Sequence, residues 1–203
     1  MYTKFYSLPL EKQERIINAA INEFVKNGYD KASTNDIVRG AEISKGSLFN
    51  YFNNKKDLYL FLLEYATGIV DDIYQEIDFN ETDIFKRMGQ IGRVKLNIQR
   101  KFPQVFNFWF SVVNEKSAEV KAEIQEKQDN ILKEGFERIY ENIDYSKFRQ
   151  GLDIEKAINI LNWTMVGFSE KLKNDISSIE EVSDEALKEW DSYSELLKHS
   201  FYR

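Results

Sequence analysis

Residues 33–55 bring together hydroxyl, amide and ammonium groups at spacings that suit hydrogen bonding to a polyanion. Two short helices fit inside this stretch, joined by a tight turn. Ser33 or Thr34 can cap the first helix, because either hydroxyl can accept from a free backbone N–H of the first turn. Ser44 stands where the second helix needs its N-cap. The pattern is typical of a helix-turn-helix, whose second helix enters a DNA major groove.

The predicted second helix has an apolar face and a hydrogen-bonding face. Leu48 and Phe52 lie one turn apart and would pack inward. The candidates for phosphate contact are Thr34, Ser44, Ser47, Tyr51 and Lys55, with the helix-start amides of Lys45 and Gly46. The candidates for base contact are Asn35, Lys45, Ser47 and Asn50, because Asn can bind adenine through two atoms and Lys can donate to guanine. A blander interpretation stays open, in which the hydroxyls only cap helices and the other side chains form a solvated face.

From Ile16 to about Leu62 the sequence resembles the amino-terminal domain of the TetR/AcrR family of bacterial transcriptional regulators. The most specific words are Ser44–Phe52, Asn54–Leu58 and the earlier Asn27-Gly28-Tyr29. The resemblance implies a helix-turn-helix that binds double-stranded DNA, within an all-α chain of about nine helices. It also implies a homodimer that responds to a small-molecule effector.

Two positions depart from the pattern of the resembled family. Glu42 stands in the turn where the family usually has Gly, which reaches positive φ without strain. Glu42 therefore predicts mild strain or a different turn, and it places a negative charge near the DNA. Phe49 stands where the family usually has Tyr, so any contact through that hydroxyl is lost.

Composition and charge narrow the remaining classes of function. The 203 residues include no cysteine and one histidine, His199, which excludes disulfides and thiolate metal sites and nearly excludes histidine-based catalysis. No apolar run approaches the roughly 20 residues of a membrane span, and no signal peptide is visible. Residues 1–60 carry nine Lys and Arg against seven Asp and Glu, whereas the rest carries 19 against 27. We expect a cytoplasmic protein without cofactor or metal, whose basic end faces a polyanion, although such unevenness also arises by chance.

Helical periodicity extends along the chain and predicts an N-terminal three-helix head, residues 1–54, and a helical C-terminal domain, residues 55–203, for which the resemblance implies effector binding and dimerisation. A helix from Lys55 to about Ile77 would link the two. Residues 1–8 are expected to form a loosely held arm from which Lys4 can reach phosphate. The other helices are expected at about 9–28, 82–102, 104–114, 118–143 with Phe136 facing inward, 154–174, and from the N-cap Ser183 onward after a connection at 175–182.

The aromatic side chains of the C-terminal domain have two interpretations. The plain one is a hydrophobic core. Because regulators of the resembled family bind small molecules among these helices, the other is a pocket for an apolar or aromatic ligand. Its candidate wall residues are Tyr65, Phe106, Trp109, Phe110, Trp163 and Phe168.

The last two helices are candidates for a dimer interface, because in the resembled family two such helices from each subunit form a four-helix bundle. The candidate interface residues are Gly167, Trp190, Tyr193 and Leu197, and packing within one subunit is the alternative. A dimer would present two heads about 34–36 Å apart to a palindromic site.

These observations predict a sequence-specific DNA-binding regulator, most simply a repressor that a small apolar ligand releases from a palindromic operator. The alternative is a helix-turn-helix activator or adaptor that acts through a protein partner without a small ligand. An enzyme that uses the aromatic cavity is the third class, and the single histidine and missing cysteine disfavour it.

Overall fold

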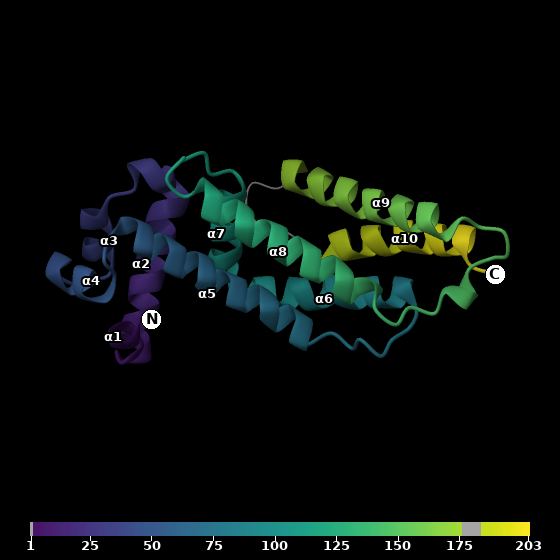
Figure 1. Ribbon diagram of the computed structural model, residues 1–203, viewed down its shortest axis with the longest axis horizontal. Helices are drawn as coiled ribbons and strands as arrows, with labels where there is room; N and C mark the ends of the chain where they lie inside the picture. The colour runs from purple at the N-terminus through teal and green to yellow at the C-terminus, as the bar shows by residue number, and fades with distance from the viewer. Residues whose placement is uncertain (1, 176–183) are drawn as a thin grey trace. The chain divides into compact units, whose positions relative to one another are not determined.

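The computed structural model describes residues 2–175 and 184–203, and there the chain is built from helices (Figure 1). The helices are α1 (Thr3–Tyr6), α2 (Leu10–Lys31), α3 (Thr34–Gly40), α4 (Lys45–Tyr51), α5 (Lys55–Gln75), α6 (Ile84–Lys101), α7 (Pro103–Val113), α8 (Lys121–Tyr140), α9 (Ile154–Asp175) and α10 (Asp184–Phe201), with a 3-10 turn at Tyr145–Lys147. Within those ranges the only β pairing is an isolated bridge between Phe148 and Tyr202. The all-α prediction is confirmed, with ten α-helices described where about nine were expected.

The chain divides into two compact units. The first comprises Met1–Asp71 and Phe102–Ile131, and the second comprises Asp72–Lys101 and Leu132–Arg203. The functional boundary predicted after residue 54 stays a prediction, because compactness does not say which part performs which task. In the described part of the chain, no helix combines the length and apolar character that a membrane crossing needs.

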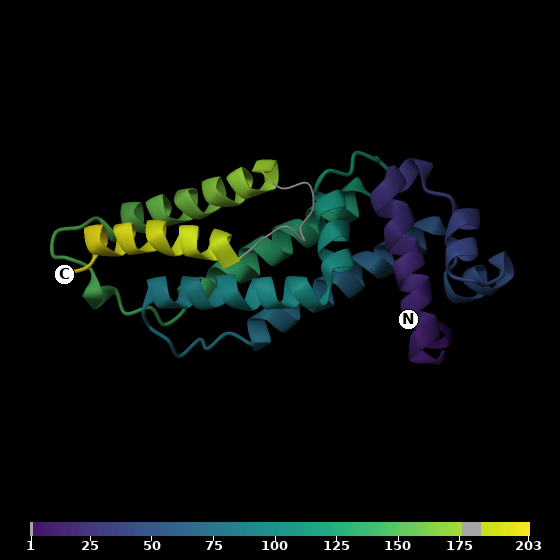
Figure 2. The same cartoon turned by 180° about the vertical axis from the view of Figure 1, so that it is seen from behind.

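The first unit is organised around α2, which packs against α3 and α7 (Figure 2). Phe24 on α2 is buried, and its ring meets that of Tyr59 on α5 edge to face at 5.0 Å between centroids. Tyr59 in turn contacts the ring of Phe108 on α7 at 5.4 Å. Edge-to-face pairs of this kind add to the energy of apolar burial, so α2, α5 and α7 share one aromatic core.

The N-terminal residues correct one expectation, because they form a docked helix and not a loose arm. Phe5 on α1 is fully buried, and its ring packs on those of Phe52 and Phe61 at 5.2 and 4.9 Å. The Tyr2 hydroxyl donates to Oδ1 of Asp57 at 2.7 Å, and burial together with this bond raises the pKa of Tyr2. The buried ring is what the expectation missed, since four helical residues alone would not be stable.

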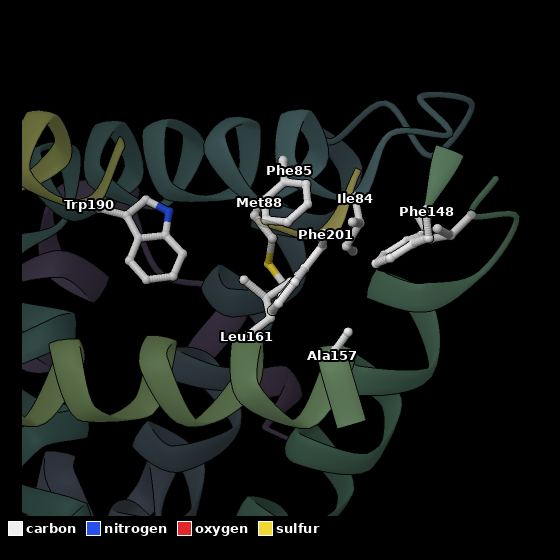
Figure 3. Close-up of a cluster of buried hydrophobic side chains, with 9 residues drawn as sticks. Ile84, Phe85, Met88, Phe148, Ala157, Leu161, Trp190 and Phe201 are labelled. Carbon is white, nitrogen blue, oxygen red and sulfur yellow. The ribbon is translucent and has the colours of Figure 1, made fainter. Parts of the chain in front are cut away.

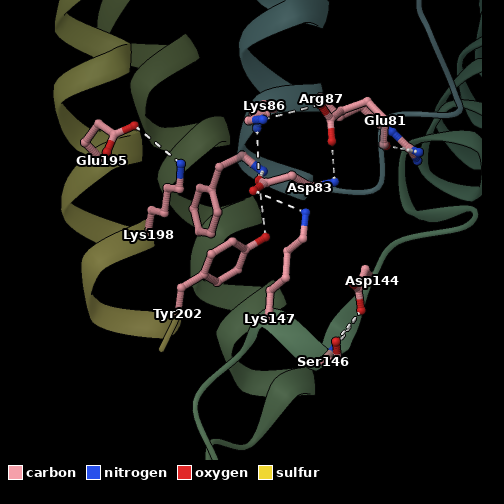
Figure 4. A network of polar contacts seen from close by, with 11 residues as sticks. Glu81, Asp83, Lys86, Arg87, Asp144, Ser146, Lys147, Glu195, Lys198 and Tyr202 are labelled. Carbon is pink, nitrogen blue, oxygen red and sulfur yellow. Dashed lines mark hydrogen bonds and ion pairs between the residues drawn. The ribbon is translucent and has the colours of Figure 1, made fainter.

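The second unit has its own apolar core between α6, α9 and α10 (Figure 3). Its buried members are Ile84, Phe85, Met88, Ile143, Phe148, Ala157, Leu161, Trp190 and Phe201. A polar network fastens the C-terminus beside this core (Figure 4). Asp83 caps the start of α6, accepting from the N–H of Phe85 at 3.0 Å, and also accepts from the Tyr202 hydroxyl at 3.2 Å.

Arg87 is a fully buried cation in the second unit. Its guanidinium donates to the carbonyl oxygens of Ile139 and Glu141 at the end of α8 and to those of Phe79 and Glu81 before α6. Burial lowers the pKa of this group, and nearby carboxylates oppose that shift. Four carbonyl acceptors offset much of the cost of removing the charge from water, so Arg87 ties two connections together.

Some sequence expectations fall on residues outside the described ranges. They are the N-cap at Ser183 and most of the connection at 175–182. The expectation that Phe136 faces inward concerns a side chain that the structure does not describe, although its backbone belongs to α8.

Candidate nucleic-acid interface

The two helices of the helix-turn-helix begin with the side-chain caps that the sequence predicted. Ser33 Oγ accepts from the N–H of Asp36 at 3.4 Å, and Ser44 Oγ accepts from the N–H of Ser47 at 3.0 Å. The inward side chains of Ile37 and Leu48 are at most 1% exposed. The apolar face therefore fixes both helices on the core, and their other face is left outward (Figure 1).

In the turn between α3 and α4, Glu42 has a left-handed backbone although it carries a side chain. Glu42 has φ of +54°, a region that an L-residue other than Gly occupies only at a cost of about 1 kcal/mol. The predicted mild strain is thus present, and the alternative of a different turn is not taken. The N–H of Ile43 still reaches the carbonyl of Val38 at 3.0 Å, which closes the turn.

Most predicted DNA contacts lie where a ligand could reach them. Exposed positions are Asn35, Ser44, Lys45, Gly46 and Asn50, and half-buried positions are Thr34, Ser47 and Tyr51. These residues share α3, α4 and the turn before α4, so they belong to one helix-turn-helix. Their assignment to phosphate or base stays a prediction.

Lys55 is the predicted phosphate contact that the structure places differently. Its ammonium donates to the carbonyl oxygens of Tyr29 and Asp30 at 2.8 and 3.2 Å and to that of Ala32 at 3.4 Å. It also lies 4.6 Å from the centroid of the Tyr29 ring. An ammonium has three N–H bonds, so Lys55 is committed to the end of α2 and must give up these bonds before it can bind phosphate.

The loop between α7 and α8 also binds the end of α2, at the corner where the chain passes from α2 to α3. Glu115 accepts the N–H of Tyr29, and the Tyr29 hydroxyl donates to Glu119 Oε1 at 2.6 Å. Burial and this hydroxyl bond raise the pKa of Tyr29. Gly28 has a φ of +68° just before Tyr29, in the left-handed region that glycine adopts without strain. The corner between α2 and α3 is therefore held in place from two sides, and it precedes α3 and α4, the two helices of the helix-turn-helix.

Three further side chains lie at α4 and were not among the predicted DNA contacts of this helix-turn-helix: Lys4, Lys12 and Phe49. Lys4 Nζ donates to Oδ1 of Asn50 at 2.9 Å, and Lys12 Nζ lies 6.0 Å from the ring centroid of Tyr51. Phe49 is 39% exposed on α4, where an apolar ring can contact a thymine methyl group. The sequence carried a signal for Lys4 in the apolar Phe5 within the supposed arm, and a signal for Phe49 in its own apolar side chain at an off-period position.

The predicted pocket residues are divided between the two units. Tyr65, Phe106, Trp109 and Phe110 belong to the first, and Trp163 and Phe168 belong to the second. Trp163 is 71% and Phe110 46% exposed, so neither forms a closed wall within its own unit. Phe106 is buried, and the indole N–H of Trp109 is buried with no acceptor among the described residues.

The predicted dimer residues also separate. Trp190 is 7% exposed within the core of its own unit, and the half-buried Leu197 packs against that core, so the assignment of these two residues to an interface stays a prediction. Tyr193 is 41% exposed, and an added methyl group at the exposed Gly167 would meet no atom within 4 Å among the described residues. The exposed apolar side chains of these two helices are instead Ile160, Trp163, Val166, Tyr193 and Leu196.

The sequence of this chain is similar to those of known proteins. Residues 16–61 match the family model described as bacterial regulatory proteins, tetR family. The fatty acid metabolism regulator protein of Bacillus subtilis is 26% identical over 161 residues, which cover 76% of this chain and 79% of that protein.

Two solved structures resemble the whole chain. One is a TetR family transcriptional regulator from Chloroflexus aurantiacus, with a TM-score of 0.64, 23% identity and coverage of 98% of this chain and 97% of that one. The other is the fatty acid degradation regulator FadR from Bacillus halodurans, with a TM-score of 0.61, 21% identity and coverage of 91% and 97%. At these identities the two structures establish the fold.

Proposed function

The chain belongs to the TetR/AcrR family of DNA-binding transcriptional regulators, and we propose that it is a homodimeric repressor that a small apolar ligand releases from a palindromic operator. Its place of action is the cytoplasm. The observation that carries the proposal is the outward face of α4, where Lys45 and Asn50 stand exposed on a helix whose inner face is buried. Such a helix can enter a major groove without disturbing its core.

A homodimer is supported by the apolar side chains that α9 and α10 leave exposed. Ile160, Trp163 and Val166 recur every three residues along α9, with exposures of 41%, 71% and 51%. An apolar patch of this kind on a protein that must stay in solution marks a site of association. A second copy offers the same stripe, which suits the self-complementary contact of a two-fold dimer.

Release by an apolar ligand is supported by α7. This helix is apolar along most of its length, and it carries Trp109, whose buried N–H has no acceptor among the described residues. A bound molecule with an acceptor group could satisfy that donor. Two similar proteins are named for fatty acid metabolism or degradation, which makes an elongated apolar molecule the first class to test.

Movement of α5 would transmit the ligand signal. The helix begins at Lys55, directly after the recognition helix, and its Tyr59 contacts Phe108 of α7. A ligand shifts the equilibrium only if it binds the DNA-free form more tightly than the DNA-bound form.

The proposal is tested by selecting bound fragments from randomised DNA with the purified protein and measuring affinity by fluorescence anisotropy. We expect a two-fold symmetric consensus whose affinity falls when apolar acyl compounds are added. Asymmetric fragments or the absence of enrichment would contradict the palindromic repressor. Unchanged affinity with every compound would favour the activator or adaptor that acts through a protein partner.

A further inference from the structure

Helix α1 is a fixed part of the head beside the recognition helix, although it lies outside the residues 16–61 that match the family model. Phe5 anchors it in the core, with ring contacts to Phe52 and Phe61 and a further one to Tyr51 of α4 at 6.3 Å. Tyr2 fastens its other end to Asp57. The side chain between these two anchors, Lys4, is therefore presented at a defined place.

Lys4 and Asn50 form an exposed pair at the face that would meet DNA. The Lys4 ammonium lies 2.9 Å from Oδ1 of Asn50. Because an ammonium can only donate, the atom of Asn50 that faces it has to be the oxygen. This contact turns the amide Nδ2 of Asn50 away from Lys4, where it is free to donate to another molecule.

We propose that Lys4 is a specificity-determining residue, which turns Asn50 from a reader of adenine into a reader of guanine. Guanine offers two acceptors in the major groove, N7 and O6, whereas adenine offers the acceptor N7 and the donor N6 amino group. The pair presents two donors, Nζ of Lys4 and Nδ2 of Asn50, which complement the guanine edge. An adenine amino group would face the Lys4 ammonium, donor against donor, and only one lone pair of the Asn50 oxygen would be left to accept from it.

The inference rests on the proposed DNA binding and reverses the expectation that Asn50 binds adenine through two atoms. It requires no change in the fold, since both side chains are exposed and α1 is held by other residues. Removing the Lys4 ammonium frees the Asn50 amide to use its oxygen and nitrogen together on adenine.

The test compares the bases selected by wild type, Lys4→Met, Lys4→Arg, Asn50→Ala and the double variant Lys4→Met/Asn50→Ala, each from the same randomised DNA. Lys26→Met is the matched control, because it removes the same charge from an exposed position away from α4. Lys26 lies about 20 Å along α2 from Lys12, the residue of α2 that is next to Tyr51 of α4. Wild type should prefer guanine at the base that Asn50→Ala identifies. Lys4→Met should shift the guanine-to-adenine ratio there by about fivefold or more toward adenine. Lys4→Arg should keep guanine, and Lys4→Met should change nothing further once Asn50 is Ala.

Other outcomes overturn the inference in distinguishable ways. An equal loss of affinity for all sequences in Lys4→Met, with a shallower salt dependence, would make Lys4 a phosphate contact only. No effect of Lys4→Met, or the same effect as Lys26→Met, would remove Lys4 from the interface. An adenine preference in wild type would refute the pairing while leaving DNA binding intact. Failure of wild type to select any sequence would overturn both this inference and the proposed function.

Discussion

Glu115 Oε2 accepts the backbone N–H of Tyr29 at 2.7 Å, across 86 residues of sequence. The other carboxylate oxygen accepts the N–H groups of Lys116 and Ser117, each at 2.8 Å. Ser117 Oγ then donates to Oδ1 of Asp30 at 2.6 Å. The loop after α7 therefore binds the end of α2, where Lys55 also binds. Residues 115–117 of this loop connect α7 to the helix-turn-helix.

Loss of this connection should destabilise the first unit. Glu115→Ala removes a charged acceptor from three N–H groups, and we expect a loss of about 1.5–3 kcal/mol in the free energy of unfolding. Glu115→Gln keeps one acceptor and should lose less. Urea denaturation measures both, with the exposed Glu126→Ala of α8 as the control. Equal stability of Glu115→Ala and Glu126→Ala would contradict this role of the connection.

Lys55 should affect stability more than the salt dependence of DNA binding. Lys55→Ala leaves carbonyl oxygens of Tyr29 and Asp30 without their donor, at a cost of about 1–3 kcal/mol. Lys45→Ala, on the exposed face of α4, should spare stability and lower the log–log salt slope by about one. Denaturation together with anisotropy at several salt concentrations separates the two. A lower slope and intact stability for Lys55→Ala would return it to the phosphate contacts.

Lys55 and Lys4 show how much of the structure could be predicted from the sequence. Caps, apolar spacing and the recognition helix followed from local rules, and the structure kept them at Ser33, Ser44 and Leu48. The partner of Lys55 did not follow, because it lies at the end of another helix and no local pattern links the two. The fixed place of Lys4 did not follow for a similar reason, since a four-residue helix has no periodicity to recognise and depends on the buried position of Phe5.

The tryptophans illustrate a second limit of sequence reasoning. Trp163 and Trp190 both stand on predicted helices. Spacing alone left open whether Trp163 faces a core or a ligand pocket, and whether Trp190 faces a core or a partner subunit. The structure buries Trp190 beside Phe168, with 5.6 Å between the ring centroids, and leaves Trp163 outside. Which apolar stripe of a helix is covered depends on how neighbouring helices cross it, and that is a long-range property.

Relief of the strain at Glu42 should stabilise the head. Glu42→Gly removes a side chain from a left-handed residue, and we expect a gain of up to about 1 kcal/mol in the free energy of unfolding. Glu42→Ala keeps the strain and should show no such gain. Both variants lose a negative charge, so both should bind DNA more tightly at low salt. Thermal or urea unfolding that ranks Ala at or above Gly would show that this backbone is unstrained.

Stability above pH 10 should depend on Tyr140. Burial raises the pKa of its hydroxyl to about 12, whereas the unfolded chain has a pKa of about 10. The folded state thus holds the proton more tightly, and this contribution is present below pH 10 and lost as pH rises from about 10 through about 12. Tyr140→Phe should therefore lose less stability than wild type between about pH 9 and about pH 12 in urea titrations. The exposed Tyr6→Phe is the control, and parallel losses in all three proteins would contradict the assignment.

The dimer should depend on Trp163 and not on Trp190. Trp163→Glu places a charge on a side chain that is 71% exposed in the single chain, so the fold should survive. In a dimer built on α9 and α10 the same charge would be buried without a partner, which is strongly unfavourable. Sedimentation should show wild type as two chains of 24.0 kDa and Trp163→Glu as one.

A matched variant and a DNA measurement complete this experiment. Leu10→Glu introduces the same charge at a side chain that is 75% exposed on α2, and it should remain a dimer. Trp163→Glu should lose affinity for a full palindrome and keep the weak affinity for a half-site, because each head still folds. A Trp163→Glu protein that stays dimeric would move the interface away from the α9 stripe. A monomeric wild type that binds the full palindrome tightly would remove the need for an interface.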